Sequence, residues 1–206
     1  MQPPEVAALF TAPDGSYHFA RWGRPIVPVV FGLDDATLPV IKGAIEAVVT
    51  LAGHRMAETD PELGANLMYF FCRNWAELPQ VPGLDGLVPG LVALCHRLSE
   101  GEANQYRLFR FDPDGAIKAV FVFLRMDAAL QDTPAEDLAL VQAASVMCLW
   151  AEAAFQRLAP LARTEAGVIL RPQVAAVIRA AYDPILPSGT RDPAHALRLA
   201  ARLGLT

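Results

Sequence analysis

The chain has 206 residues, of which 53% are apolar and 19% are charged, and its formal net charge at pH 7 is −5. This length and composition predict one folded domain over residues 1–206 and exclude a disordered chain. A net negative charge gives no general attraction to a phosphate backbone, so no nucleic-acid partner is expected. The long uncharged run 138–151 is shorter than the ~20 residues that cross a bilayer, so no membrane span is predicted.

The amino terminus and the cysteines indicate the compartment. No basic stretch followed by an apolar one begins this sequence, so no signal peptide is expected in it. The three cysteines, Cys72, Cys95 and Cys148, lie in apolar runs, which predicts buried free thiols and a cytoplasmic location. Arginine far outnumbers lysine, which occurs only at Lys42 and Lys118, and alanine is abundant. This usage is typical of a GC-rich bacterial genome.

The first elements alternate between helix and strand. A short helix is predicted over residues 5–10. Residues 26–31 are apolar and largely β-branched, and the internal Pro28 favours an edge strand or a bulge. Residues 38–51 repeat apolar side chains at helical spacing, and Gly53 lies where such a helix would end.

A second group of elements follows. Residues 66–72 are almost entirely apolar and predict an interior strand. Residues 78–90 are rich in proline and glycine, which indicates turns, and they lead into a helix over 91–98. Residues 105–111 and 117–124 then predict an antiparallel hairpin, since a turn sequence, Asp-Pro-Asp-Gly, separates them.

Residues 133–160 are predicted to form one long helix at the centre of the fold. Thr133 and Glu136 match a capping box, with a proline at the first helical position. The residues behind this box carry no charge over several turns, which is typical of a buried helix. We therefore expect Met147 and Trp150 in the core.

Two further helices complete a helical carboxyl-terminal part, residues 133–206. One covers 172–182, and the last begins after Asp192-Pro193 and ends at Gly204. The order of elements predicts an α+β fold, with a small mixed sheet and a buried central helix.

This order of strand, long helix, apolar strand, hairpin and buried helix resembles the zincin-like fold of small metalloproteases. The segment Ala181-Tyr-Asp-Pro-Ile-Leu-Pro-Ser-Gly189 is also similar to a Tyr-Asp-Pro…Pro-Gly segment of a bacterial uncharacterised family related to those enzymes. In zincins the buried helix carries His-Glu-x-x-His, which binds Zn²⁺ and activates its water. The corresponding helix here carries instead Gln142, Ser145, Cys148 and Glu152. The resemblance therefore implies a version of the fold without the protease site, a metal or a cofactor.

One candidate site lies on the predicted central helix. Cys148 and Glu152 are expected one helical turn apart, with Ser145 on the same face. A carboxylate in an apolar groove has a raised pKa and can act as an acid or a base. Alternatively, Glu152 lies where the helix meets water. The histidines offer no pair at helical spacing, so no metal site is expected.

A second candidate site is a basic stripe on the final helix. Arg191, His195, Arg198 and Arg202 recur at intervals of four, three and four residues, which places them on one helix face. We expect this face to be exposed, and either simply solvated or docked onto an acidic partner or onto the acidic body of the chain itself.

Two functions remain open from the sequence. The first is a non-catalytic binding or interaction protein whose partner, a protein or a small molecule, is unknown. The second is a hydrolase with a non-standard site beside the helix 133–160.

Overall fold

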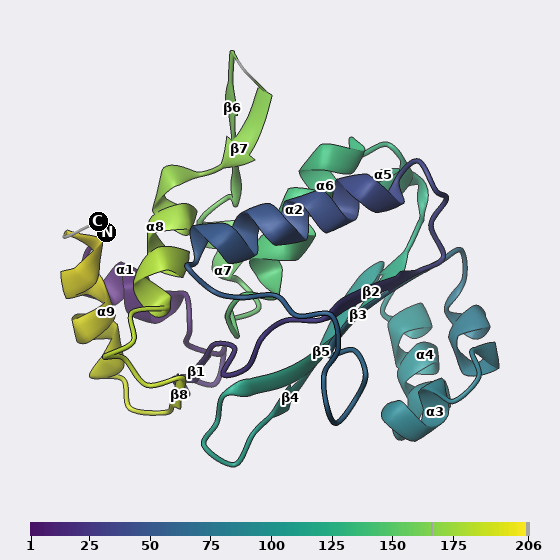
Figure 1. Cartoon of the computed structure of the whole chain (residues 1–206), viewed down its shortest axis with the longest axis horizontal. Helices are drawn as coiled ribbons and strands as arrows, with labels where there is room; N and C mark the ends of the chain where they lie inside the picture. Colours follow the sequence, from purple (N-terminus) through teal and green to yellow (C-terminus); the bar gives the residue numbers. More distant parts are fainter. Residues whose placement is uncertain (166, 205–206) are drawn as a thin grey trace.

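The computed structural model describes residues 1–165 and 167–204. A four-stranded sheet with the order β2-β3-β5-β4 lies at its centre (Figure 1). Its strands are β2 (Pro28–Phe31), β3 (Leu67–Cys72), β4 (Gln105–Phe111) and β5 (Ile117–Arg125). β3 runs parallel to β2 and to β5, whereas β4 runs antiparallel to β5. The sheet is therefore mixed, and the predicted α+β class is confirmed.

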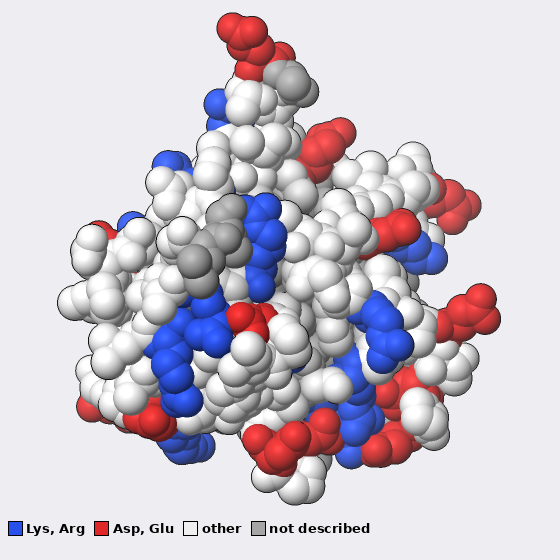
Figure 2. Space-filling view, turned by 60° about the vertical axis from the view of Figure 1, so that its left-hand side comes forward, with Lys and Arg blue, Asp and Glu red and all other residues white. Residues whose placement is uncertain are grey.

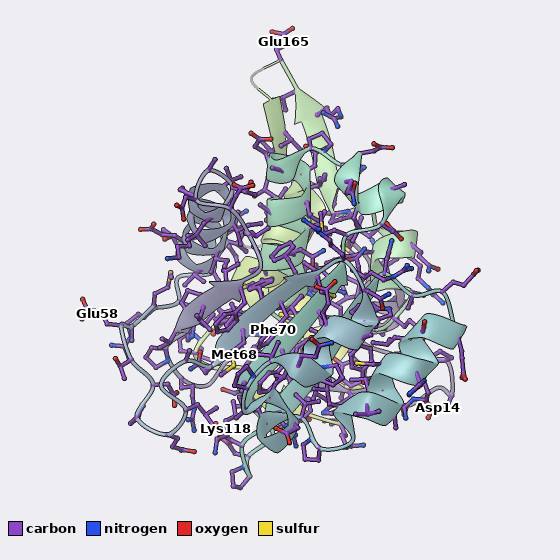
Figure 3. The ribbon with its side chains drawn as sticks, turned by 90° about the vertical axis from the view of Figure 1, so that its right-hand side faces the viewer. Asp14, Glu58, Met68, Phe70, Lys118 and Glu165 are labelled. Atoms are coloured by element: carbon purple, nitrogen blue, oxygen red, sulfur yellow. The ribbon has the colours of Figure 1, made fainter. Side chains whose placement is uncertain are left out.

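Helices cover both faces of this sheet (Figure 1). On one face lie α2 (Leu38–Leu51) and α6 (Ala135–Ser145), and on the other lie η1 (Trp75–Gln80), α3 (Leu84–Leu87) and α4 (Leu91–Glu100). Successive side chains of a strand point to opposite faces. Tyr69 on β3 accordingly joins the core under α2 and α6, whereas its neighbours Met68 and Phe70, labelled in Figure 3, join the core under α4.

Several sequence predictions are confirmed. α2 has the predicted bounds, and Gly53 follows its end with φ +65°, a conformation that glycine adopts without strain. All six residues of β3 are buried, as expected for an interior strand. β2 lies at an edge of the sheet, where Pro28 costs no hydrogen bond of an interior ladder. β4 and β5 form the predicted hairpin, with Phe109 opposite Val120.

The prediction of one helix over 133–160 is wrong. Within this range the chain instead forms α6 and α7 (Ala154–Arg157), with a non-helical segment between them, and a separate short helix, α5 (Ala128–Gln131), precedes it. The predicted capping box is also wrong, because Thr133 Oγ1 donates to the Ala129 carbonyl oxygen at 2.9 Å and Pro134 is the N-cap of α6.

Contacts with the amino-terminal part explain why α6 ends where it does. The backbone N–H of Leu149 donates to the Ala20 carbonyl oxygen at 2.9 Å, and the indole N–H of Trp22 donates to the Val146 carbonyl oxygen at 2.7 Å. These bonds replace the i to i−4 bonds that a continuing helix would form.

The two side chains expected in the core of that helix differ in burial. Met147 is buried, with 1% of its surface exposed. Trp150 is only partly buried: its ring stacks on Phe10 with 5.3 Å between the centroids, and its indole N–H donates to the Ala144 carbonyl oxygen at 3.0 Å.

The carboxyl-terminal part is not entirely helical, contrary to prediction. A hairpin of β6 (Leu161–Thr164) and β7 (Gly167–Leu170) lies between α7 and α8 (Pro172–Ala181). Figure 3 shows Glu165 at its far end, away from the body of the molecule. An ion pair of Arg163 with Asp137, 2.7 Å between Nη2 and Oδ2, joins the hairpin to α6.

The end of the chain packs against its beginning. β8 (Gly189–Thr190) pairs antiparallel with β1 (Phe19–Ala20), and α9 (His195–Leu203) contacts α1 (Pro3–Ala8) and α8. Gly204 follows α9, as the sequence predicts.

All three cysteines are free and buried, and their burial agrees with the prediction from the apolar runs around them. Each helix within residues 1–165 and 167–204 is too short or too polar to cross a membrane.

Trp22 provides a test of the contact that ends α6. Its side chain is fully buried, and its indole N–H satisfies the Val146 carbonyl oxygen. Trp22→Phe should lower the free energy of unfolding by about 2–4 kcal/mol, because it leaves a cavity and an unpaired carbonyl group. Val92→Ala, at a position 57% exposed, should change stability by less than about 0.5 kcal/mol. Chemical denaturation measures both; a loss below about 1 kcal/mol for Trp22→Phe would contradict this assignment.

Candidate functional site

The predicted arrangement of Ser145, Cys148 and Glu152 on one helix face is wrong. α6 ends at Ser145, so Cys148 and Glu152 lie in the non-helical segment beyond it. Cys148 is fully buried, and burial raises the pKa of its thiol far above the usual range. Glu152 is exposed. The structure therefore removes the geometric basis for an acid–base site at these residues.

The predicted exposure of the basic stripe is also wrong in part. Arg191 is exposed but precedes α9, which begins at His195. Arg198 is exposed and pairs with Asp192, with 3.4 Å between Nη2 and Oδ2. Arg202 is half-buried and pairs through Nε with Asp183.

Arg198 and Arg202 thus pair with carboxylates of the same chain, one of the alternatives open from the sequence. Figure 2, which turns the side of α8 and α9 toward the viewer, shows basic and acidic groups side by side on this face.

His195 is buried rather than part of an exposed stripe. Its Nδ1 lies 2.8 Å from the hydroxyl oxygen of Tyr17, and its ring lies 4.2 Å from that of Phe19, centroid to centroid. Burial, with the Arg198 guanidinium nearby, lowers the pKa of His195 to about 4. The imidazole is therefore neutral near pH 7 and anchors the start of α9.

A different polar cluster lies between β4 and the carboxyl-terminal end of α6. Arg107 Nε donates to Ser145 Oγ at 2.7 Å, and Arg107 Nη2 donates to Gln142 Oε1 at 2.7 Å and to Gln105 Oε1 at 3.2 Å. Gln142 Nε2 also donates to Gln105 Oε1, at 2.8 Å. We call these four residues, Gln105, Arg107, Gln142 and Ser145, the Arg107 cluster.

The local sequence explains how this cluster assembles. Gln105 and Arg107 are two residues apart on a strand, so both point to the face that α6 covers. Gln142 and Ser145 are three residues apart on a helix, so both point to one side of α6. Gln142 is 1% exposed and Ser145 5% exposed, so these neutral side chains hold the guanidinium from the buried side.

The cluster contains one charge and no carboxylate. Within residues 1–165 and 167–204, no carboxylate oxygen lies within 4.0 Å of the Arg107 guanidinium. Burial lowers the pKa of Arg107, yet an arginine remains protonated at physiological pH. The carbonyl groups at the end of α6 favour a positive charge there.

One nitrogen of Arg107 has no hydrogen-bond partner among the residues that the structure describes. Nη1 forms no hydrogen bond with any described residue, and it is not fully shielded from solvent. The half-buried guanidinium thus keeps one donor group that an acceptor from outside the chain could use.

β4 also carries a free edge. It is the last strand of the sheet and pairs only with β5 among the described strands (Figure 1). Asn104 and Arg125 are a hydrogen-bonded pair, because the Arg125 N–H donates to the Asn104 carbonyl oxygen. Phe109 and Val120 lie opposite each other without such a bond, because the Val120 N–H donates to the Asn66 carbonyl oxygen, on the side away from β4. In an antiparallel ladder such bonds alternate along a strand. The N–H and C=O groups of Gln105, Arg107 and Phe109 therefore point to the free edge.

Arg107 was not among the predicted site residues, since the strand pattern around it becomes informative only once the helix that covers this face is known. The strand 105–111 places tyrosine and leucine on one face and Gln105, Arg107 and Phe109 on the other. An arginine between a glutamine and a phenylalanine on a face that a helix covers indicates a specific polar partner, since charged groups are rarely buried without one.

Neither a metal-binding group among the described residues nor a known relative adds to this description. No group of three or more His, Cys, Asp or Glu residues in the described part of the chain could hold a metal ion. Comparisons of the chain with protein-family models, curated proteins and solved structures gave no match.

The burial of His195 predicts a loss of stability in acid. Its pKa is near 6.5 in the unfolded chain and about 4 in the folded one. Between these values the unfolded state binds more protons, so the free energy of unfolding should fall as the pH is lowered from about 6.5 to about 4. The contribution of this residue should be on the order of 2–3 kcal/mol.

His195→Gln should reduce that pH dependence in urea denaturation at several pH values, and His96→Gln, at an exposed histidine, serves as the matched control. Equal pH profiles for wild type and His195→Gln would contradict the assignment.

Proposed function

We propose that this protein is a non-catalytic binding protein that takes up an extended segment of a partner polypeptide along the free edge of β4. The observation that carries the proposal is the row of outward backbone groups on Gln105, Arg107 and Phe109, which have no backbone partner in the described part of the chain. An exposed strand edge is a template for a further strand, whose backbone hydrogen bonds supply affinity.

The two edges of the sheet are not equally suited to this role. β2, at the opposite edge, has four residues and begins with Pro28, whereas β4 has seven residues and no proline. The register of β4 shifts between Arg110 and Phe111, which interrupts a regular edge there. A partner strand would therefore pair along residues 105–109.

Pairing with a second copy of the chain is less favourable than pairing with another polypeptide. A symmetric antiparallel pairing of the three outward residues would place Arg107 opposite Arg107 of the second copy. Like charges directly opposite each other destabilise a strand pair. The edge thus favours a partner of different sequence.

The non-catalytic part of the proposal rests on the chemistry of α6. The Ser145 hydroxyl donates to the Gln142 backbone carbonyl oxygen at 2.8 Å and accepts from Arg107, so its bonds are with groups that cannot remove its proton. Cys148 is buried and Glu152 lies apart from it at the surface. These observations favour binding over the alternative of a hydrolase.

We keep the zincin-like outline, a bacterial origin and a cytoplasmic location as parts of the proposal. The order β2, α2, β3, β4, β5, α6 supports the outline, and α6 carries Gln142 and Ser145 where zincins carry the metal-binding motif. The arginine-rich composition supports the origin, and the three free cysteines support the location.

Strand addition predicts protection of specific amides. Heptapeptides selected from a random display library for binding to the protein should slow hydrogen exchange at the outward amides of Gln105, Arg107 and Phe109, because each forms a new hydrogen bond. Amide exchange followed by NMR measures this.

The matched control is the same peptide with N-methyl groups on the alternate residues that face β4. This change removes the peptide donors to the β4 carbonyl groups and prevents close approach of the two strands, so it should abolish binding and protection. Failure to select any binder, or binders that leave these three amides unprotected, would overturn the proposal.

A further inference from the structure

Resting on this proposed function, we infer that Arg107 makes the β4 edge selective for a partner strand that carries an acidic side chain, aspartate or glutamate, directly opposite Arg107. The inference concerns the chemistry of the bound segment and not the pairing of its backbone.

The Arg107 guanidinium lacks a counter-ion among the described residues. The Arg107 guanidinium is half-buried, and its partners are an alcohol and two amides, which carry no charge. A partly desolvated cation gains most from a carboxylate, since hydrogen bonds between ionised groups are shorter and stronger than neutral ones.

The guanidinium is held in place by its neutral partners. Three neutral contacts from Ser145, Gln142 and Gln105 fix Nε and Nη2, so the orientation of the guanidinium is set before any ligand binds. Nη1 has no hydrogen-bond partner within residues 1–165 and 167–204, and it is not fully shielded from solvent. A donor held in place in this way costs little conformational entropy when it binds an acceptor.

The register of an added strand would place one of its side chains beside Arg107. A residue directly opposite Arg107 on an added strand would point its side chain to the same face, the one that α6 covers. Its Cβ would lie about 4.5–5.5 Å from that of Arg107, within reach of a carboxylate–guanidinium contact. Side chains opposite Tyr106 and Leu108 would point to the other face, under which α4 lies.

The carboxylate belongs to a side chain within the strand and not to a chain end. Outward backbone groups flank Arg107 on both sides, at Gln105 and at Phe109. A peptide that ended opposite Arg107 would leave one of these flanking residues without a partner.

The matched control for Arg107 lies on the same strand. Arg110 is exposed and on the opposite face, where its Nη2 donates to the Leu87 carbonyl oxygen at 3.1 Å. Arg110→Gln removes the same charge from β4 as Arg107→Gln does but leaves the Arg107 cluster intact.

Binding of blocked heptapeptides by fluorescence anisotropy tests the inference. The probe is acetyl-Thr-Val-Thr-Glu-Thr-Val-Thr-amide, and in two versions glutamine or lysine replaces its glutamate. The wild-type protein should bind the glutamate peptide about tenfold more tightly than the glutamine peptide and bind the lysine peptide most weakly. A peptide that ends at the glutamate with a free α-carboxylate should also bind less tightly.

The protein variants locate the selectivity. Arg107→Gln should remove the preference for glutamate over glutamine, whereas Arg110→Gln should retain it. The comparison of peptides on the wild-type protein needs no variant, so it remains decisive if Arg107→Gln proves unfolded by circular dichroism.

Amide exchange separates the two possible failures. If glutamate and glutamine peptides bind equally and both protect the amides of Gln105, Arg107 and Phe109, the selectivity is wrong and strand addition stands. If the wild-type protein binds the glutamate peptide and these amides stay unprotected, both proposals are wrong. A preference for glutamate that persists in Arg107→Gln overturns the role of Arg107.

Discussion

The structure depends on a central sheet whose interior strands are apolar on both faces. All six residues of β3 are buried, and seven of the nine residues of β5 are buried with them. Such strands must be covered on both sides, because burial of apolar surface is the main favourable contribution to folding. α2 and α6 cover one face and η1, α3 and α4 cover the other. These helices lie over the two faces of the sheet, which ends at the edge strands β2 and β4.

The same constraint accounts for the position of Arg107. β4 closes the sheet on one side, so its side chains are only half-buried, and a charged residue under the end of α6 still reaches solvent. Neutral groups on α6 and β4 hold the guanidinium without neutralising it. Natural sheets often carry charges at their edges to prevent unwanted pairing. Under the proposed function, the same charge would disfavour pairing with a second copy of the chain and favour pairing with an acidic segment.

Local patterns predicted the elements that the local sequence determines. The 3.6-residue repeat of 38–51 and the turn between 105–111 and 117–124 each gave the correct element, and Pro28 correctly indicated an edge. The prediction of one helix over 133–160 was wrong because α6 ends at Ser145, where two hydrogen bonds join the chain to residues more than a hundred positions earlier. The Trp22 indole N–H donates one of them, and the Ala20 carbonyl oxygen accepts the other. No periodicity within the segment contains that information.

The candidate site residues were likewise predictable only where local sequence determines their position. Ser145 and Gln142 were noted on the correct helix, but Arg107, their partner from β4, was not, since its meaning depends on which helix covers its strand. His195 was expected at the surface because its helical spacing matched the arginines around it. In the structure the helix turns that residue toward Tyr17 and Phe19.

The most direct test of this account is amide hydrogen exchange in the free protein, residue by residue along β4. The amides of Tyr106, Leu108 and Arg110 point to β5 and should exchange slowly, whereas those of Gln105, Arg107 and Phe109 point to the free edge and should exchange much faster. Uniform protection along the strand would mean that another part of the chain or a second copy already occupies the edge, and it would contradict the account.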